Sequence, residues 1–100
     1  MATQLQTLIE EVKQENLTKG ELENLYARLT HIYSLAHMET SDKEKLEAVY
    51  FLNHTEKNDV SARRKFSGSP DGLRLIELKH VIKSLEKLLS SVKHRLFNSY

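Results

Sequence analysis

The amino-acid sequence predicts an all-α fold: a small helical domain built on a long antiparallel helical hairpin, of about residues 41–66 and 70–97, with one or two N-terminal helices packed on it. Three observations lead to this prediction. Apolar residues recur at alternating spacings of three and four, which is the period of an amphipathic helix. The 100 residues include only three glycines and one proline, too few for a loop-rich β fold. No run alternates apolar and polar residues at the period of a strand.

The first two helices are predicted from an apolar stripe and a capping signature. The stripe covers residues 5–12, where leucine, isoleucine and valine recur at helical spacing. Thr18 followed by Glu21 forms a capping box, in which a hydroxyl and a carboxylate satisfy the free amides at a helix start. We therefore expect a second helix from Thr18 to about Met38.

The second half of the chain is predicted to form the hairpin. Ser41 and Glu44 repeat the capping signature, so we expect a third helix to begin there and to continue to about Phe66. A turn follows, in which Ser69 is placed to cap the last helix and Pro70 to occupy its first position, where a missing N–H costs nothing.

The last helix, expected from Pro70 to about Phe97, carries the widest apolar stripe of the chain. Such a helix is about 40 Å long, and we expect its stripe to exceed what a domain of this size readily covers. The sequence therefore predicts a homo-oligomer with coiled-coil packing. The residues of the predicted oligomer interface are Leu75, Leu78, Ile82, Leu85, Leu89, Val92 and Leu96.

Composition excludes several classes of protein. The chain has no cysteine, which removes disulfides, zinc knuckles, iron–sulfur clusters and thiol catalysis. No apolar run approaches the roughly 18–20 residues of a membrane helix, and the acidic residues Glu10, Glu11 and Glu15 fit neither a secretory signal nor a transit peptide. We expect a single all-helical domain over residues 1–100, located in the cytoplasm and without membrane contact.

Catalytic chemistry is not indicated by the sequence. No nucleophile elbow, phosphate-binding glycine loop or dinucleotide fingerprint is present. The five histidines are spread along the chain, and helix-surface positions explain them better than metal ligation. We expect no enzyme activity, no catalytic residues, no metal and no cofactor.

Charge is distributed unevenly along the chain. Residues 1–62 contain six Lys or Arg against eleven Asp or Glu, whereas residues 63–100 contain nine against three. Such an asymmetry suggests an anionic partner for the basic part, or packing of one part on the other. A lysine ridge could track a phosphate backbone, and an aromatic ring could stack on a base. The candidate nucleic-acid-binding residues are Arg63, Arg64, Lys65, Phe66, Arg74, Lys79, Lys83 and Lys87.

The second half of the chain resembles the T4-type phage recombination mediators. The resemblance covers about residues 44–96: Glu44 and Glu47-Ala48 on one helix, the segment Ser61-Ala62-Arg63-Arg64-Lys65-Phe66-Ser67-Gly68, a leucine-rich helix, and the ending Lys93-His94-Arg95. It implies a helical oligomer that binds single-stranded DNA and assists a recombinase. Arg63, Arg64 and Lys65 match the basic stretch before the turn, whereas a long acidic insert after the turn is missing here.

Two functions are therefore expected from the sequence. The first is a non-enzymatic, oligomeric accessory protein that contacts nucleic acid, in its single-stranded form, through the basic part. This protein would act in the host cytoplasm if it is phage-encoded. The alternative is a small helical protein-interaction module, an inhibitor or adaptor of a partner protein, that binds no nucleic acid.

Overall fold

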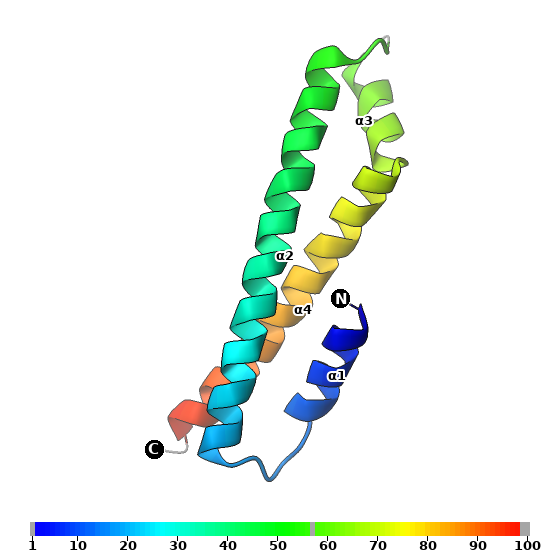
Figure 1. The fold of residues 1–100 in the computed structure, drawn as a ribbon. Coiled ribbons are helices and arrows are strands. Elements are labelled where there is room, and N and C mark those ends of the chain that lie inside the picture. Colours follow the sequence, from blue (N-terminus) through cyan, green and yellow to red (C-terminus); the bar gives the residue numbers. More distant parts are fainter. Residues whose placement is uncertain (1, 57, 99–100) are drawn as a thin grey trace.

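The protein is a helical hairpin with a shorter helix packed at each end. The computed structural model describes residues 2–56 and 58–98, with side chains from residue 4 onward. Within this part the helices are α1 (Ala2–Val12), α2 (Lys19–Asn53), α3 (Asp59–Ser67) and α4 (Pro70–Asn98). Figure 1 shows α2 and α4 running antiparallel, with α1 beside the end where α4 finishes and α3 beside the end where α2 finishes. The molecule measures 58 × 18 × 16 Å. The predicted all-α hairpin is confirmed.

The first arm of the hairpin differs from the prediction, because α2 is one helix of 35 residues. The expected boundary between Met38 and Ser41 does not exist. Nothing in this stretch breaks a helix, and the Thr40 hydroxyl donates to the carbonyl of Ala36 at 2.8 Å, inside the helical backbone. The predicted hairpin of 41–66 and 70–97 is therefore corrected to α2 and α4, and the Ser41–Glu44 signature lies in mid-helix.

The chain also breaks where a continuous helix to Phe66 was expected. His54 leaves helical geometry with φ −70° and ψ 151°, and Asn58 begins α3 by accepting a hydrogen bond from the Ser61 amide at 2.9 Å. The segment between α2 and α3 is polar, so a helix there would have no apolar face to bury. Asn58 is a favoured N-cap residue, and this signal was present in the sequence.

The predicted caps of α2 and α4 are confirmed. The Glu21 amide donates to the Thr18 hydroxyl at 3.1 Å, and the Thr18 amide donates to the Glu21 carboxylate at 3.4 Å, so both halves of the capping box are present. At the other end of the molecule, the Gly72 amide donates to the Ser69 hydroxyl at 3.2 Å, and Pro70 is the first residue of α4.

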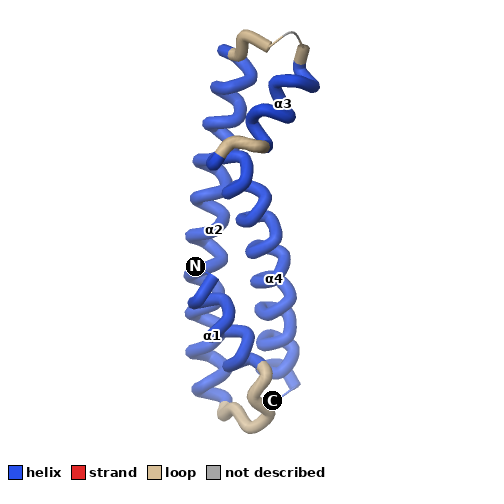
Figure 2. The backbone as a smooth tube through the Cα atoms, turned by 90° about the vertical axis from the view of Figure 1, so that its right-hand side faces the viewer, coloured by secondary structure: helices blue, strands red, loops and turns tan. Residues whose placement is uncertain are grey.

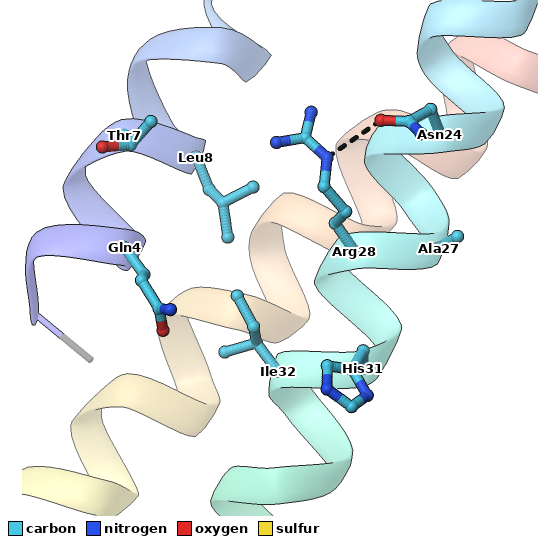
Figure 3. Close-up of a pocket in the computed structure, with 8 residues that line it drawn as sticks. All are labelled: Gln4, Thr7, Leu8, Asn24, Ala27, Arg28, His31 and Ile32. Atoms are coloured by element: carbon cyan, nitrogen blue, oxygen red, sulfur yellow. Dashed lines mark hydrogen bonds between the residues drawn. The ribbon is translucent and has the colours of Figure 1, made fainter.

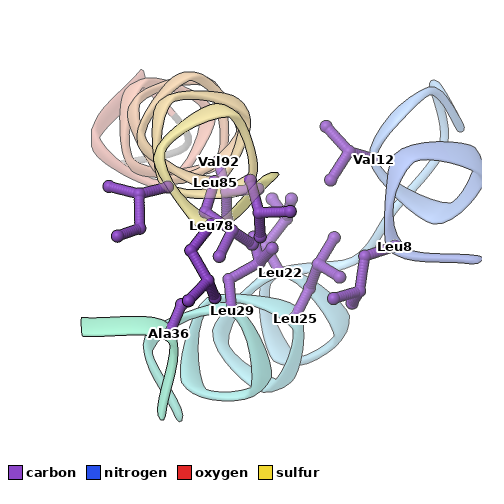
Figure 4. Close-up of a cluster of buried hydrophobic side chains, with 11 residues drawn as sticks. Leu8, Val12, Leu22, Leu25, Leu29, Ala36, Leu78, Leu85 and Val92 are labelled. Atoms are coloured by element: carbon purple, nitrogen blue, oxygen red, sulfur yellow. The ribbon is translucent and has the colours of Figure 1, made fainter. Parts of the chain in front are cut away.

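The hydrophobic core fills the space between α1, α2 and α4. Figure 4 shows the leucines of α2 and α4 pointing toward one another, with Leu8 and Val12 of α1 entering from the side. Leu25, Leu29, Leu78, Leu85 and Val92 are the largest side chains that are fully buried. A core spread along so much of the hairpin explains why α2 and α4 stay paired.

The apolar stripe of α4 lies inside the single chain. Leu75, Leu78, Ile82, Leu85 and Val92 are all buried, and Leu89 and Leu96 pack partly buried against the same core. The prediction that these residues form an oligomer interface is therefore wrong, because they pack in the core of the chain itself. The long α2 covers the stripe that two shorter helices would have left open.

Arg95 fastens the end of α1 to α4. Its guanidinium donates to the carbonyl oxygens of Val12 at 2.7 Å and Gln14 at 2.6 Å. Val12 is the last residue of α1 and Gln14 lies two residues beyond it. Carbonyl groups at a helix C-terminus lack an intrahelical amide partner, so a cationic donor stabilises them.

None of the helices in the described part of the chain combines the length and the apolar character that a membrane span requires.

Candidate nucleic-acid interface

The hairpin turns a charge difference along the sequence into one across the molecule. In Figure 2, α2 lies on one side and α3 and α4 on the other, while α1 lies in front and contacts both α2 and α4. The helices α3 and α4 carry nine Lys or Arg against four Asp or Glu, whereas α1 and α2 carry four against eight. The side formed by α3 and α4 therefore attracts anions, and the opposite side repels them.

A ridge of three lysines follows the outer surface of α4. Lys79, Lys83 and Lys87 are exposed, and among the described residues they have no hydrogen bond or ion pair. Residues four apart lie about 6 Å from each other along a helix axis, so the three ammonium groups form a line. Leu78 and Leu85, on the inner side of the same helix, hold this ridge toward solvent because they are fully buried.

The acidic residue closest to this ridge in sequence is turned away from it. Glu86 accepts a hydrogen bond from the Tyr33 hydroxyl at 3.0 Å, across to α2. This hydrogen bond, together with the nearby carboxylate charge, raises the pKa of Tyr33. The contact directs Glu86 toward α2, and in the described part of the chain no ion pair joins it to Lys83 or Lys87.

Two arginines of α3 extend the basic surface. Arg63 and Arg64 are exposed and have no acidic partner among the described residues. Ala62 and Phe66, on the inner side of α3, are buried against α2 and α4 and fix which side of the short helix faces solvent. We call Arg63, Arg64, Lys79, Lys83 and Lys87 the basic edge.

Two of the predicted basic residues have other partners. Arg74 is bound to Glu39 and Glu77, so it ties α4 to α2 and is not available to a phosphate. Lys65 lies 3.0 Å from Glu56, and this pairing raises the pKa of Lys65. Lys65 remains at the surface, but its charge is shared with a carboxylate. The sequence could not show the pairing of Arg74 with Glu39 or of Lys65 with Glu56, because these partners lie outside the helix that carries the cation. Glu77, in contrast, is at ordinary helical spacing from Arg74.

The proposed base-stacking ring lies inside the protein. Phe66 is only 5% exposed, and its ring centroid lies 5.7 Å from that of Tyr50 and 6.4 Å from that of Phe51. This aromatic cluster joins α3 to the end of α2. The prediction that Phe66 is a stacking platform is therefore wrong, because the ring anchors α3 to the hairpin.

An open pocket of about 520 Å³ lies between α1 and α2. Figure 3 shows its lining, which consists of Gln4, Thr7, Leu8, Asn24, Ala27, Arg28, His31 and Ile32. Arg28, its one formally charged side chain at neutral pH, is already held by Asn24 at 2.9 Å and by the carboxylate of Glu11. The rest of the lining is formed by uncharged polar side chains, an imidazole and apolar side chains.

The described residues contain no group of three or more His, Asp or Glu side chains that could hold a metal ion. Taken together, the fold and surface define a helical hairpin protein with one basic edge. Comparisons with protein-family models, curated protein sequences and solved structures give no significant match. The resemblance to phage recombination mediators therefore stays a prediction.

Proposed function

We propose that this is a non-enzymatic nucleic-acid-binding protein that contacts the phosphate backbone through the basic edge. The observation that supports this proposal is the set of five exposed cationic side chains without an acidic partner in the described part of the chain. Each cation that meets a phosphate releases condensed counterions, which is a large, sequence-independent source of affinity.

The composition of the basic edge favours backbone contact over base recognition. Three of its five members are lysines, which are flexible point charges without the planar fork by which an arginine reads guanine in the major groove. The aromatic ring expected to stack on a base is buried. We therefore propose binding with little sequence preference, in which the contacts position the protein on the strand.

Single-stranded nucleic acid is the form that we propose as the ligand. The support for this choice is the resemblance of residues 44–96 to recombination mediators, and an accessory role in recombination belongs to the same proposal. A comparison of matched single-stranded and double-stranded oligonucleotides at one salt concentration tests the choice. Tighter binding to the duplex would contradict it.

A second candidate function is a helical protein-interaction module without nucleic-acid binding. It is favoured by apolar side chains that α2 exposes to solvent, among them Met38 and Leu52, at 65% and 84% exposure. A phosphate backbone cannot satisfy these groups, whereas a protein surface can. In that case the basic edge would bind an acidic protein surface.

The test uses two matched double variants that each remove two positive charges. Lys83→Gln with Lys87→Gln changes the basic edge, and Lys13→Gln with Lys19→Gln changes the opposite end of the sequence. Binding to a labelled single-stranded oligonucleotide is measured by fluorescence anisotropy. We expect the first variant to bind more weakly. The slope of the logarithm of its binding constant against the logarithm of salt concentration should be shallower by about 1.4, for two lost contacts. Equal losses in both variants would contradict a localised site.

A further inference from the structure

A second apolar stripe runs along the solvent side of α2, away from the core. Its positions alternate at three and four, which is the heptad spacing of a coiled-coil seam. The stripe consists of Leu35, Met38, Asp42, Lys45, Val49 and Leu52. The four apolar members are between 44% and 84% exposed, and no element of the described chain covers them.

The two charged residues in the stripe are placed symmetrically. Asp42 and Lys45 carry opposite charges, are exposed, and form no ion pair within the described chain. The midpoint of the stripe falls between Lys43 and Glu44, so Asp42 precedes it and Lys45 follows it at the same distance. Leu35 and Leu52 are likewise equidistant from this midpoint, as are Met38 and Val49. The stripe is therefore complementary to itself when one helix is reversed.

We infer that this stripe is an interface between two copies of the chain, whose α2 helices pack antiparallel about a two-fold axis at the midpoint. In this register Asp42 faces Lys45 of the second copy, and Lys45 faces its Asp42. Leu35 then packs on Leu52 of the second copy, and Met38 on Val49. A two-fold axis requires such self-complementarity. A parallel pair would place like charges opposite each other and is disfavoured.

The surface area of the molecule leaves room for such an interface. The chain exposes 7051 Å², whereas a compact monomer of its mass, 11.6 kDa, exposes roughly 5,800 Å². The excess exceeds the area of about 800 Å² that each partner buries in a standard interface. The stripe spans 18 residues and therefore about 26 Å of helix, enough for six layers of side chains.

The rest of α2 is compatible with this arrangement. Ala36 and Thr40, on the side that packs on α4, are buried and point away from the stripe. Ser41 and Ala48 border the stripe and are exposed and small, so a second helix can approach closely. The basic edge lies on α3 and α4 and remains open in the dimer. The inference therefore does not depend on the proposed nucleic-acid binding, and it assigns to a second copy the same Met38 and Leu52 side chains that favour the second candidate function.

A charge-swap series tests the register by sedimentation equilibrium at micromolar concentration. We expect the wild-type chain to sediment as a dimer. Asp42→Lys alone and Lys45→Asp alone each turn two attractive pairs into two repulsive ones, and should raise the dimer dissociation constant about tenfold. Asp42→Lys combined with Lys45→Asp should restore wild-type dimerisation. A monomeric wild-type chain, or a double variant no better than the single variants, would overturn the inference.

Cross-linking tests the antiparallel orientation independently, because the chain has no cysteine of its own. Under mild oxidation, an equimolar mixture of Leu35→Cys and Leu52→Cys chains should form a disulfide-linked dimer. Either variant alone should give no cross-linked band and should run as a monomer on a non-reducing gel, since identical positions lie at opposite ends of the interface. Circular dichroism confirms that each variant folds. Efficient cross-linking of a single variant with itself would show a parallel pairing and contradict the inference.

Discussion

Arg74 on α4 forms a bidentate ion pair with Glu39 on α2. Its Nε and Nη2 donate to the two carboxylate oxygens at 2.5 and 2.8 Å, while Nη1 donates to Glu77 at 2.8 Å. A bidentate pair of this kind fixes both the distance and the orientation of the helices that it joins. Arg74, one of the residues predicted to bind phosphate, therefore joins the two long helices of the hairpin.

The Glu39–Arg74 pair predicts a specific acid sensitivity. The guanidinium lowers the pKa of Glu39 below its ordinary value of 4.5. A carboxyl whose folded pKa is depressed stabilises the fold above its unfolded pKa, and this contribution is lost as pH falls through the folded pKa. We therefore expect Glu39→Gln to reduce the free energy of unfolding by about 1 kcal/mol at neutral pH. This difference between the variant and the wild type should become smaller below about pH 4.5.

Thermal melts of the wild type and Glu39→Gln between pH 3 and pH 7 check this expectation. The difference in Tm between the two proteins should shrink toward the acidic end of the range. A difference that stays constant with pH would show that the pair contributes no proton-linked stability.

Gly72 is predicted to be intolerant of any side chain. A Cβ at this position would lie 2.0 Å from the carbonyl oxygen of Phe66, which belongs to the backbone and cannot move aside cheaply. We expect Gly72→Ala to destabilise the protein by about 1–3 kcal/mol through this clash. Gly20→Ala is the matched control, because a Cβ there meets nothing within 4 Å. Urea unfolding should show no loss for the control, and equal losses would contradict the close approach.

Leu85 is predicted to be a central contributor to stability. Its side chain is fully buried between the arms of the hairpin, so Leu85→Ala should cost about 2–5 kcal/mol. Leu73→Ala, on the exposed side of the same helix at 57% exposure, should change stability by less than about 1 kcal/mol. Both are measured by urea unfolding at one protein concentration. A cost near zero for Leu85→Ala would contradict the packing of α4.

A substitution of Phe66 distinguishes a structural role of its ring from a role in binding. Because its ring packs on Tyr50 and Phe51, Phe66→Ala should destabilise the protein by about 3 kcal/mol. At temperatures where the variant is folded, the salt dependence of nucleic-acid binding should be unchanged. Weakened binding at an unchanged Tm would instead indicate that the ring contacts the ligand.

The sequence predicted the features that local rules control. The Thr18–Glu21 capping box and the Ser69-Pro70 helix start are short-range signals, and both appear in the structure as predicted. The same capping rule failed at Ser41, since a serine followed by a glutamate three residues later is compatible with a helix interior. Whether such a pair begins a helix or lies inside one depends on the residues that pack around it in the folded protein.

The candidate site was less predictable because it depends on contacts between elements. Sequence placed Lys79, Lys83 and Lys87 on one line of a helix, which requires only the helical period. It could not assign Arg74 to Glu39, 35 residues away in the chain, nor bury Phe66 against Tyr50. The apolar stripe of α4 was assigned to a second copy because the length of α2 was underestimated.

The central claim is that the basic edge meets phosphates, and the salt dependence of binding tests it most directly. The dissociation constant of the wild-type protein for a single-stranded oligonucleotide is measured over a series of salt concentrations. Five contacts, at roughly 0.7 logarithmic units each, predict a slope of about −3.5 per protein chain. No detectable binding at low salt, or a slope near zero, would contradict the claim.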